Sequence, residues 1–214
     1  MDGRVKERRY DASSRQARSA ETRQRILATA RELILARGYR ATTVAAIASG
    51  AGVNVDTVYE LVGRKPVLLR ALIERAISGG DEPVAAQDRE YVKAIRAEPD
   101  AARKLAIYAT AVRRIQERMA PLFMSLRDAS STEPEARAVW REISERRAVN
   151  MRLLVRDLRE AGGLRRGLSV DAAADMVWAL NSSEMFVLLT VDRGWSPKRF
   201  ERWLADTWCR LLLP

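Results

Sequence analysis

Histidine is absent from the chain, and cysteine occurs once, at position 209. Histidine is the side chain used most often for general acid–base catalysis and, together with cysteine, for binding zinc. A zinc site with these ligands, a cysteine–histidine nucleophile and an intramolecular disulfide therefore cannot be built within one chain. We expect no catalytic residues, no metal and no cofactor, and we do not expect an enzyme; the alternative is an all-helical enzyme that relies on carboxylates alone.

The sequence also lacks an apolar run that approaches the ~18–20 residues of a membrane-spanning helix. The charged N-terminus, with Arg4, Lys6, Arg8 and Arg9, is not followed by an apolar segment and therefore does not have the form of a secretory signal. A single cysteine agrees with a reducing compartment. These absences predict a cytoplasmic protein with no membrane partner.

Positive charge is present in excess and is unevenly distributed. Residues 1–80 hold 15 Lys and Arg against 8 Asp and Glu, whereas residues 81–214 hold 23 against 20. Most of the net charge of +10 is thus carried by the first third of the chain. Such asymmetry is typical of a protein that binds a polyanion at one end. A solvated, arginine-rich surface gives the same balance, and charge alone does not separate the two interpretations.

The pattern along the chain predicts an all-α fold. Apolar residues recur at intervals of three and four, and no stretch alternates as a half-buried strand does. Glycines and prolines separate the expected helices, which cover about 19–38, two short pieces within 39–63, 64–77, 99–126 with a kink or end at Pro121, 133–160, 170–191 and 197 onward. We expect a flexible basic arm at 1–18, a first domain at 19–80 and a second domain at 81–214.

The stretch from Val44 to Leu61 has the residue types of a helix-turn-helix. Its small core is formed by Ile47, Ala51, Val53, Val58 and Leu61, and Ala48 is small where the second helix crosses. Gly52 stands at the turn, where a positive φ favours glycine. Thr43 and Asn54 are predicted to cap the two helices. A helical hairpin that only packs is the alternative.

In the helix-turn-helix interpretation, the second helix covers about residues 55–62 and enters the major groove of DNA. Its early residues Val55, Asp56 and Thr57 would face base edges or phosphates, and Thr57 and Tyr59 can donate hydrogen bonds to phosphates. Lys65 at the start of the next helix and Arg23 in the first helix would contact the phosphate backbone of the DNA. Asp56 and Glu60 repel phosphate; either could accept a hydrogen bond from a cytosine amino group, or point outward or pair with Arg64.

These residues resemble the TetR (tetracycline-repressor-like) family of bacterial regulators. The resemblance covers about 50 residues and runs through Thr22-Arg23, Ile26-Leu27, Gly38-Tyr39, Thr42-Thr43-Val44, Ile47-Ala48, Ala51-Gly52-Val53, Thr57-Val58-Tyr59, Lys65 and Leu68-Leu69. It implies DNA contacts from Thr43, Asn54, Thr57, Tyr59 and Lys65. The sequence departs from the family at Glu60-Leu61-Val62-Gly63, where an aromatic or histidine pair followed by phenylalanine is usual.

The resemblance also implies that the second domain binds a small effector and forms a homodimer through a four-helix bundle. Two apolar seams with a spacing of 3.5 residues support a bundle. Predicted interface residues are Met151, Leu154, Leu158, Val177, Leu180, Glu184 and Val187. Arg147 and Glu184 interrupt the seams, and we expect them to pair within or across subunits, although Arg147 could instead extend to solvent and Glu184 lie at the rim.

Aromatic and methionine side chains of the second domain are candidates for lining an apolar cavity, although any one of them can equally belong to the core. They are Tyr108, Met119, Phe123, Met124, Trp140 and Trp178.

The combined prediction is an all-α protein with a helix-turn-helix DNA-binding domain and a helical ligand-binding and dimerisation domain. We expect a repressor that a small molecule releases from double-stranded operator DNA; alternatives are an activator with the same fold or a helical interaction module.

Overall fold

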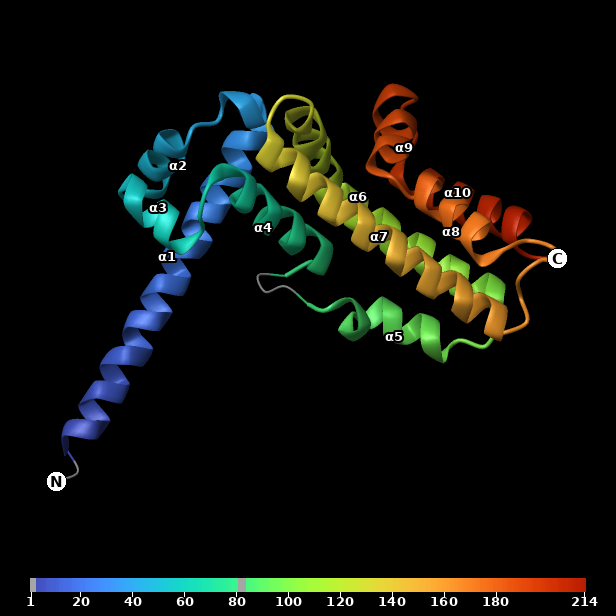
Figure 1. Cartoon of the computed structure of the whole chain (residues 1–214), viewed down its shortest axis with the longest axis horizontal. Helices are drawn as coiled ribbons and strands as arrows, with labels where there is room; N and C mark the ends of the chain where they lie inside the picture. The colour runs from blue at the N-terminus through green and yellow to red at the C-terminus, as the bar shows by residue number, and fades with distance from the viewer. Residues whose placement is uncertain (1–2, 81–83) are drawn as a thin grey trace. The chain divides into compact units, whose positions relative to one another are not determined.

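The structure, a computed structural model, describes residues 3–80 and 84–214, with side chains from residue 14 onward. Within these ranges the chain forms helices and no strand, which confirms the all-α prediction (Figure 1). Among residues 3–80 and 84–214, none of the helices combines the length and the hydrophobicity that a membrane-spanning helix requires. The chain divides into two compact units, Met1–Leu72 and Ile73–Pro214, which are described separately.

The first unit contains three helices and the beginning of a fourth: α1 (Gly3–Ala41), α2 (Val44–Ala51), α3 (Val55–Leu61) and the start of α4 (Lys65–Ser78). The division between the units lies inside α4, whereas the sequence pattern predicts it at Gly79–Gly80. The end of α4, from Ile73 onward, belongs to the second unit because it bonds to other residues of that unit. The Ala76 carbonyl accepts a hydrogen bond from Arg118 Nε at 2.9 Å, and Glu74 forms an ion pair with Arg146.

Helix α1 begins at Gly3, well before Ser19, where the sequence pattern predicts its start. Residues 4–18 contain no proline or glycine that would stop a helix. Whether residues 1–18 act as a flexible arm stays a prediction. At the other end, Gly38 interrupts the helical geometry with φ 80° and ψ 162°, which agrees with the predicted stop at this glycine.

The second unit is built on a hairpin of two long helices, α6 (Ala101–Ser130) and α7 (Pro134–Glu160) (Figure 1). Helices α5 (Glu90–Ala97), α9 (Ser183–Val187) and α10 (Pro197–Leu212) pack on α6, and α8 (Val170–Leu180) packs on α7. Large side chains from several helices fill the core between them, because each helix has one apolar stripe. Those without exposed surface include Leu105, Val155, Val177, Phe200 and Trp208.

Two expected helix ends differ in this unit. Pro121 does not end its helix, since α6 continues to Ser130. Proline removes a hydrogen bond there, but burial of the neighbouring Leu122 and Phe123 favours continuation. The helix predicted at 170–191 is instead interrupted after Leu180, because Ser182 accepts a hydrogen bond from the Met185 amide at 3.2 Å and starts α9. A π-helical turn follows at Leu188–Asp192.

Glu201 on α10 fastens this helix to α6 and should make stability depend on pH. Its carboxylate accepts hydrogen bonds from Thr110 at 3.1 Å, Arg113 at 2.5 Å and Lys198 at 3.0 Å. Burial alone would raise the pKa of Glu201, but the bonds from Arg113, Lys198 and Thr110 outweigh it and lower the pKa below its usual 4.5. The carboxylate therefore adds stability that is fully present above that value and is lost as the pH falls through the lower folded-state pKa.

We expect Glu201→Gln to lower the free energy of unfolding at about pH 7, and we expect the difference from the unmodified protein to shrink toward about pH 3. Urea unfolding followed by circular dichroism across this range measures it. A difference that stays constant with pH would show that the carboxylate charge is not what stabilises the contact.

Candidate nucleic-acid interface and ligand cavity

The turn between α2 and α3 is made by Gly52. Its backbone has φ 65° and ψ 41°, in the left-handed region that favours glycine. The Gly52 amide donates to the Ser49 carbonyl at 3.2 Å, and the Val53 amide donates to the Ala48 carbonyl at 3.0 Å. These bonds satisfy the last carbonyls of α2 and direct the chain into α3. The predicted helix–turn–helix is thus present, with its second helix at Val55–Leu61.

The packing beneath α3 agrees with the sequence pattern at Ile47, Ala48, Ala51 and Val58, whereas Val53 and Leu61, which were also predicted in this core, are half-buried. Ile47 and Val58 have no exposed surface, and Ala48 is 2% exposed. Gly50 is a feature that the sequence analysis missed. A Cβ atom at this position would lie 2.8 Å from Thr29 Cγ2 on α1, so a larger residue here would require the Thr29 side chain or the backbone to shift. The signal was present in the sequence, since Gly50 lies inside a helix where glycine is otherwise unfavourable.

Most of the predicted DNA contacts lie on the outer face of α3 and just before it. Val55 is 37% exposed and Tyr59 is 48% exposed. Asn54 and Asp56 are also exposed, and Thr57 is half-buried. Because Val58 anchors the opposite face, these side chains are available for a groove or a phosphate. Of the other candidates, Thr43 is exposed before α2 and Arg23 is half-buried on α1.

Lys65, the first residue of α4, has partners within the unit. Its Nζ donates to the Tyr39 carbonyl at 3.0 Å and lies 4.0 Å from the centroid of the Tyr39 ring. The ammonium thus joins the start of α4 to the end of α1 through a hydrogen bond and a cation–π contact. A phosphate bound at this helix start would share the ammonium with Tyr39.

The two predicted helix caps, Thr43 and Asn54, differ in the structure. This difference allows a role in helix stability to be distinguished from a role in DNA binding. Thr43 Oγ1 accepts the Ala46 amide at 3.1 Å, as predicted, whereas the Asn54 side chain makes no capping bond although Asn54 occupies the N-cap position. We expect Thr43→Ala to destabilise the first unit by about 1 kcal/mol and Asn54→Ala to cost much less. Thermal unfolding of both variants measures this. An equal loss in both would contradict the assignment, and lower DNA affinity in Asn54→Ala with unchanged stability would identify a direct contact.

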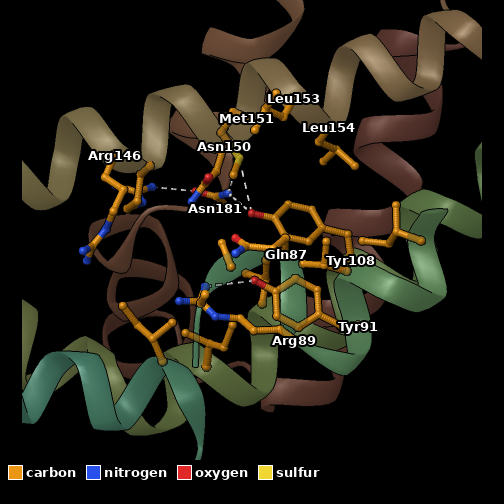
Figure 2. A pocket seen from close by; sticks show the side chains of 18 of the residues that line it. Gln87, Arg89, Tyr91, Tyr108, Arg146, Asn150, Met151, Leu153, Leu154 and Asn181 are labelled. Carbon is orange, nitrogen blue, oxygen red and sulfur yellow. Dashed lines mark hydrogen bonds between the residues drawn. The ribbon is translucent and has the colours of Figure 1, made fainter. Parts of the chain in front are cut away.

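The second unit contains a partly open cavity of about 890 Å³ between α5, α6 and α7. Figure 2 shows Tyr108 and Tyr91 from two helices on one side and Asn150, Met151 and Leu154 of α7 on the other. Leu153, which is 51% exposed, also lines it, so this side of the cavity reaches the solvent. The volume is typical of small-molecule sites.

Two of the six predicted ligand-binding residues, Tyr108 and Met119, line this cavity. The other four are elsewhere in the second unit. Phe123 is 1% exposed and belongs to the core, and Met124 is half-buried without lining the cavity. The Trp178 indole donates to the Ser144 carbonyl at 3.3 Å, and the Trp140 indole nitrogen is buried with no hydrogen-bond partner in the described ranges. The residue type of these six candidates therefore did not distinguish residues of the core from residues that line the cavity.

Polar groups on the cavity wall are connected in one network that the sequence analysis did not identify. Asn181 Nδ2 donates to Tyr108 Oη at 2.9 Å and to Met151 Sδ at 3.1 Å, and Tyr108 Oη donates to Met151 Sδ at 3.3 Å (Figure 2). Gln116 Nε2 donates to the Asn181 carbonyl at 2.6 Å. Burial, followed by the nearby Tyr91, raises the pKa of Tyr108, so its phenol stays neutral.

Four of the seven predicted dimer-interface residues are covered by other residues of the same chain, and the interface itself stays a prediction. Met151, Leu154, Leu158 and Val177 are buried within the core of the second unit and present almost no surface to a partner. Apolar spacing of 3.5 residues is satisfied equally by packing inside one chain, so it did not identify an interface. Three predicted interface residues keep partly exposed side chains, namely Leu180, Glu184 and Val187.

The expected pairing of Arg147 with Glu184 does not occur within the chain. Arg147 Nη2 donates to the Trp178 carbonyl at 3.0 Å and to Asn181 Oδ1 at 2.5 Å. Glu184 accepts a hydrogen bond from Arg127. Each charge has therefore found another partner, because the interruption after Leu180 separates Glu184 from the regular spacing of α8.

Comparison with known proteins agrees with this architecture. Residues 26–72 match the family described as bacterial regulatory proteins, tetR family. Comparison with curated protein sequences finds no significant match.

Solved structures share the fold over most of the chain. A putative transcriptional regulator from Saccharomonospora viridis in complex with choline is 23% identical, covers 91% of this chain and 98% of its own, and has a TM-score of 0.68. The transcriptional regulator FadR from Bacillus subtilis in complex with stearoyl-CoA is 19% identical, covers 87% and 97%, and has a TM-score of 0.70. The SmeT–triclosan complex is 19% identical, covers 91% and 92%, and has a TM-score of 0.71. Residues 26–72 thus form a helix-turn-helix domain that matches the tetR family, and the chain as a whole has the fold of solved structures named as TetR-family transcriptional regulators.

Proposed function

We propose that this protein is a dimeric transcriptional repressor that binds operator DNA through α3 and is released when a small molecule occupies the cavity of the second unit. The observation that carries the DNA-binding half is the left-handed turn at Gly52, followed by a helix with one buried and one exposed face. This is the geometry that a recognition helix needs to enter a major groove. The excess of basic residues in the first 80 positions supports a polyanionic partner.

The cavity supports the effector half of the proposal. Its volume of about 890 Å³ suits a small molecule, and its wall combines apolar side chains with a few convergent polar groups. The three structural relatives are named as complexes with choline, stearoyl-CoA and triclosan, three chemically different ligands. The ligand of this protein must therefore be inferred from its own residues.

Release of the dimer from the operator would follow from a shift in the populations of two conformational states. In a dimer, two copies of α3 must match successive major grooves ~34–36 Å apart. An effector that binds more tightly to a state with another spacing lowers operator affinity by the ratio of its affinities for the two states. Exposed apolar side chains on α7, α8 and the π-helical turn offer a surface for the second copy. They are Val149, Met176, Leu188 and Val191.

Selection of bound fragments from genomic DNA, followed by titration of the selected site at several salt concentrations, tests the proposal. A dimer that contacts six or more phosphates should give a log–log salt slope steeper than about −5 and a site with two-fold symmetry. Sedimentation of the free protein and of the complex should show two copies in each. A flat salt dependence, or no enriched sequence, would instead favour a helical interaction module.

A further inference from the structure

Arg147 is a cation on the cavity wall whose hydrogen bonds go to neutral groups. Nη2 donates to the Trp178 carbonyl and to Asn181 Oδ1, and the guanidinium carbon lies 4.9 Å from the centroid of the Trp178 ring. A guanidinium has five N–H groups. Those on Nε and Nη1 donate to no acceptor in the described ranges.

The carboxylates around Arg147 are engaged by other cations. Glu184 acts on it electrostatically, but its hydrogen bond goes to Arg127. Two acidic residues of the cavity wall are likewise paired elsewhere, Glu74 with Arg146 and Asp157 with Lys104. Five arginines line the cavity against three acidic residues; the arginines are 89, 96, 146, 147 and 156, and the acids are 74, 157 and 160.

Leaving this cation without a carboxylate has a cost that a ligand can offset. Burial lowers the pKa of Arg147, which means that its surroundings disfavour the charged form. A buried charge is stabilised by an opposite charge with good hydrogen-bond geometry, and a guanidinium matches a planar or tetrahedral oxyanion through two parallel bonds. Asn181 and Tyr108, in the same network, fix the position of the guanidinium.

The rest of the wall is suited to an apolar body. Apolar side chains of three helices line the cavity, namely Val112, Ile115 and Met119 of α6, Ile143 and Leu154 of α7, and Ile95 of α5. An effector with one charged end and an apolar remainder would satisfy both parts of the wall. A cationic effector would instead bring its charge next to the excess of arginine.

We propose that the effector is an organic anion whose acidic headgroup binds Arg147 beside Asn181 and whose apolar body lies between α6 and α7. This inference rests on the proposed function in one respect, namely that the cavity is the effector site. It adds the chemical class of the ligand, and it names Arg147 as the residue that selects it.

Two fluorescent probes that differ by one sulfonate test the charge requirement. The anion is 8-anilinonaphthalene-1-sulfonate, and the neutral analogue is N-phenyl-1-naphthylamine. Titrated against the full-length protein, the anion should bind about tenfold or more tightly than the neutral analogue, with one site per protomer. Arg147→Met should lower the affinity for the anion by about tenfold or more and leave the affinity for the neutral analogue unchanged. Equal binding of both probes to the unmodified protein would overturn the proposal.

Two further variants keep the test independent of any loss of packing. Asn181→Asp is nearly isosteric and places a carboxylate against Arg147. It should therefore lower the affinity for the anionic probe as much as Arg147→Met does, although the arginine is still present. Arg146→Met removes a neighbouring arginine that is paired with Glu74, and the anion should bind it as before. Each variant must unfold cooperatively, because the anionic probe also binds molten states. Anion binding that survives Asn181→Asp, or that depends on Arg146 instead, would overturn the assignment to Arg147.

The same probes separate this inference from the proposed function. Release of the protein from its selected operator is measured with each probe present. If the neutral analogue releases the protein and the anion does not, the cavity is an effector site but the anionic class is wrong. If the anion binds through Arg147 and operator affinity is unchanged, the inference about the cavity holds and the proposed release mechanism fails.

Discussion

Truncation of Thr57 and Tyr59 to alanine together should lower operator affinity about 100-fold while the protein remains folded. Tyr59 is 48% exposed and Thr57 is half-buried, so their side chains add little to the core of the first unit. Val58 between them has no exposed surface and continues to hold α3 in position. Two hydroxyl bonds to charged phosphates, each contributing about 1.5 kcal/mol, account for the factor of 100.

The effect should be the same on the selected operator and on unrelated duplexes, because contacts to phosphate carry no sequence information. Fluorescence anisotropy with both duplexes measures it, with thermal unfolding as a check on folding. Leu35→Ala, which truncates an exposed apolar residue of α1, is the matched control and should bind as the unmodified protein does. Tight binding retained by the double variant would exclude α3 as the DNA-contacting helix.

Lys104→Met should destabilise the second unit by about 3 kcal/mol. The Lys104 side chain is 4% exposed, and its Nζ lies 2.7 Å from Asp157 Oδ2 and 2.8 Å from the Ile95 carbonyl. The ammonium thereby joins α6 to α7 and α5 along the wall of the cavity. Methionine has a similar length but leaves the Asp157 carboxylate, whose side chain is 30% exposed, and the Ile95 carbonyl without their donor, which is the costly way to break an ion pair with one buried member.

An exposed pair offers a matched control for the same substitution. Lys93 lies 3.0 Å from Glu90, with side chains 56% and 91% exposed, so Lys93→Met should cost about 0.5 kcal/mol or less. Urea unfolding of both variants at neutral pH measures the two values. Replacing Asp157 by leucine in the Lys104→Met background should restore part of the loss, since the isolated charge is then removed. Similar losses in the Lys104 and Lys93 variants would show that the buried pair contributes no more than an exposed one.

The helix-turn-helix could be predicted because its requirements are local. A small residue at Ala48, a glycine at the turn and apolar residues on one face follow from helix geometry over fewer than twenty consecutive positions, and the structure has each of them. The close approach at Gly50 was missed, since it depends on where Thr29 of α1 lies rather than on the residues around the turn.

The second unit shows what sequence patterns do not determine. An apolar stripe establishes that a helix face is covered, but not whether its cover comes from the same chain or from a second copy. Met151 and Leu158 kept the spacing expected of an interface and are buried within the unit. Similarly, Phe123 and Met119 have comparable chemistry, yet one packs into the core and the other lines the cavity.

By itself, the sequence determined the helical class, the turn at Gly52 and the exposed face of the helix after it, because hydrogen bonding and side-chain spacing within one or two turns decide these features. Only the tertiary structure decided the cavity and the neighbours of Arg147, which come from α6, α7, α8 and the interruption after Leu180. The physical reason is that an isolated charge on a helix has many partners within reach. Which of them it meets depends on how distant helices pack around it.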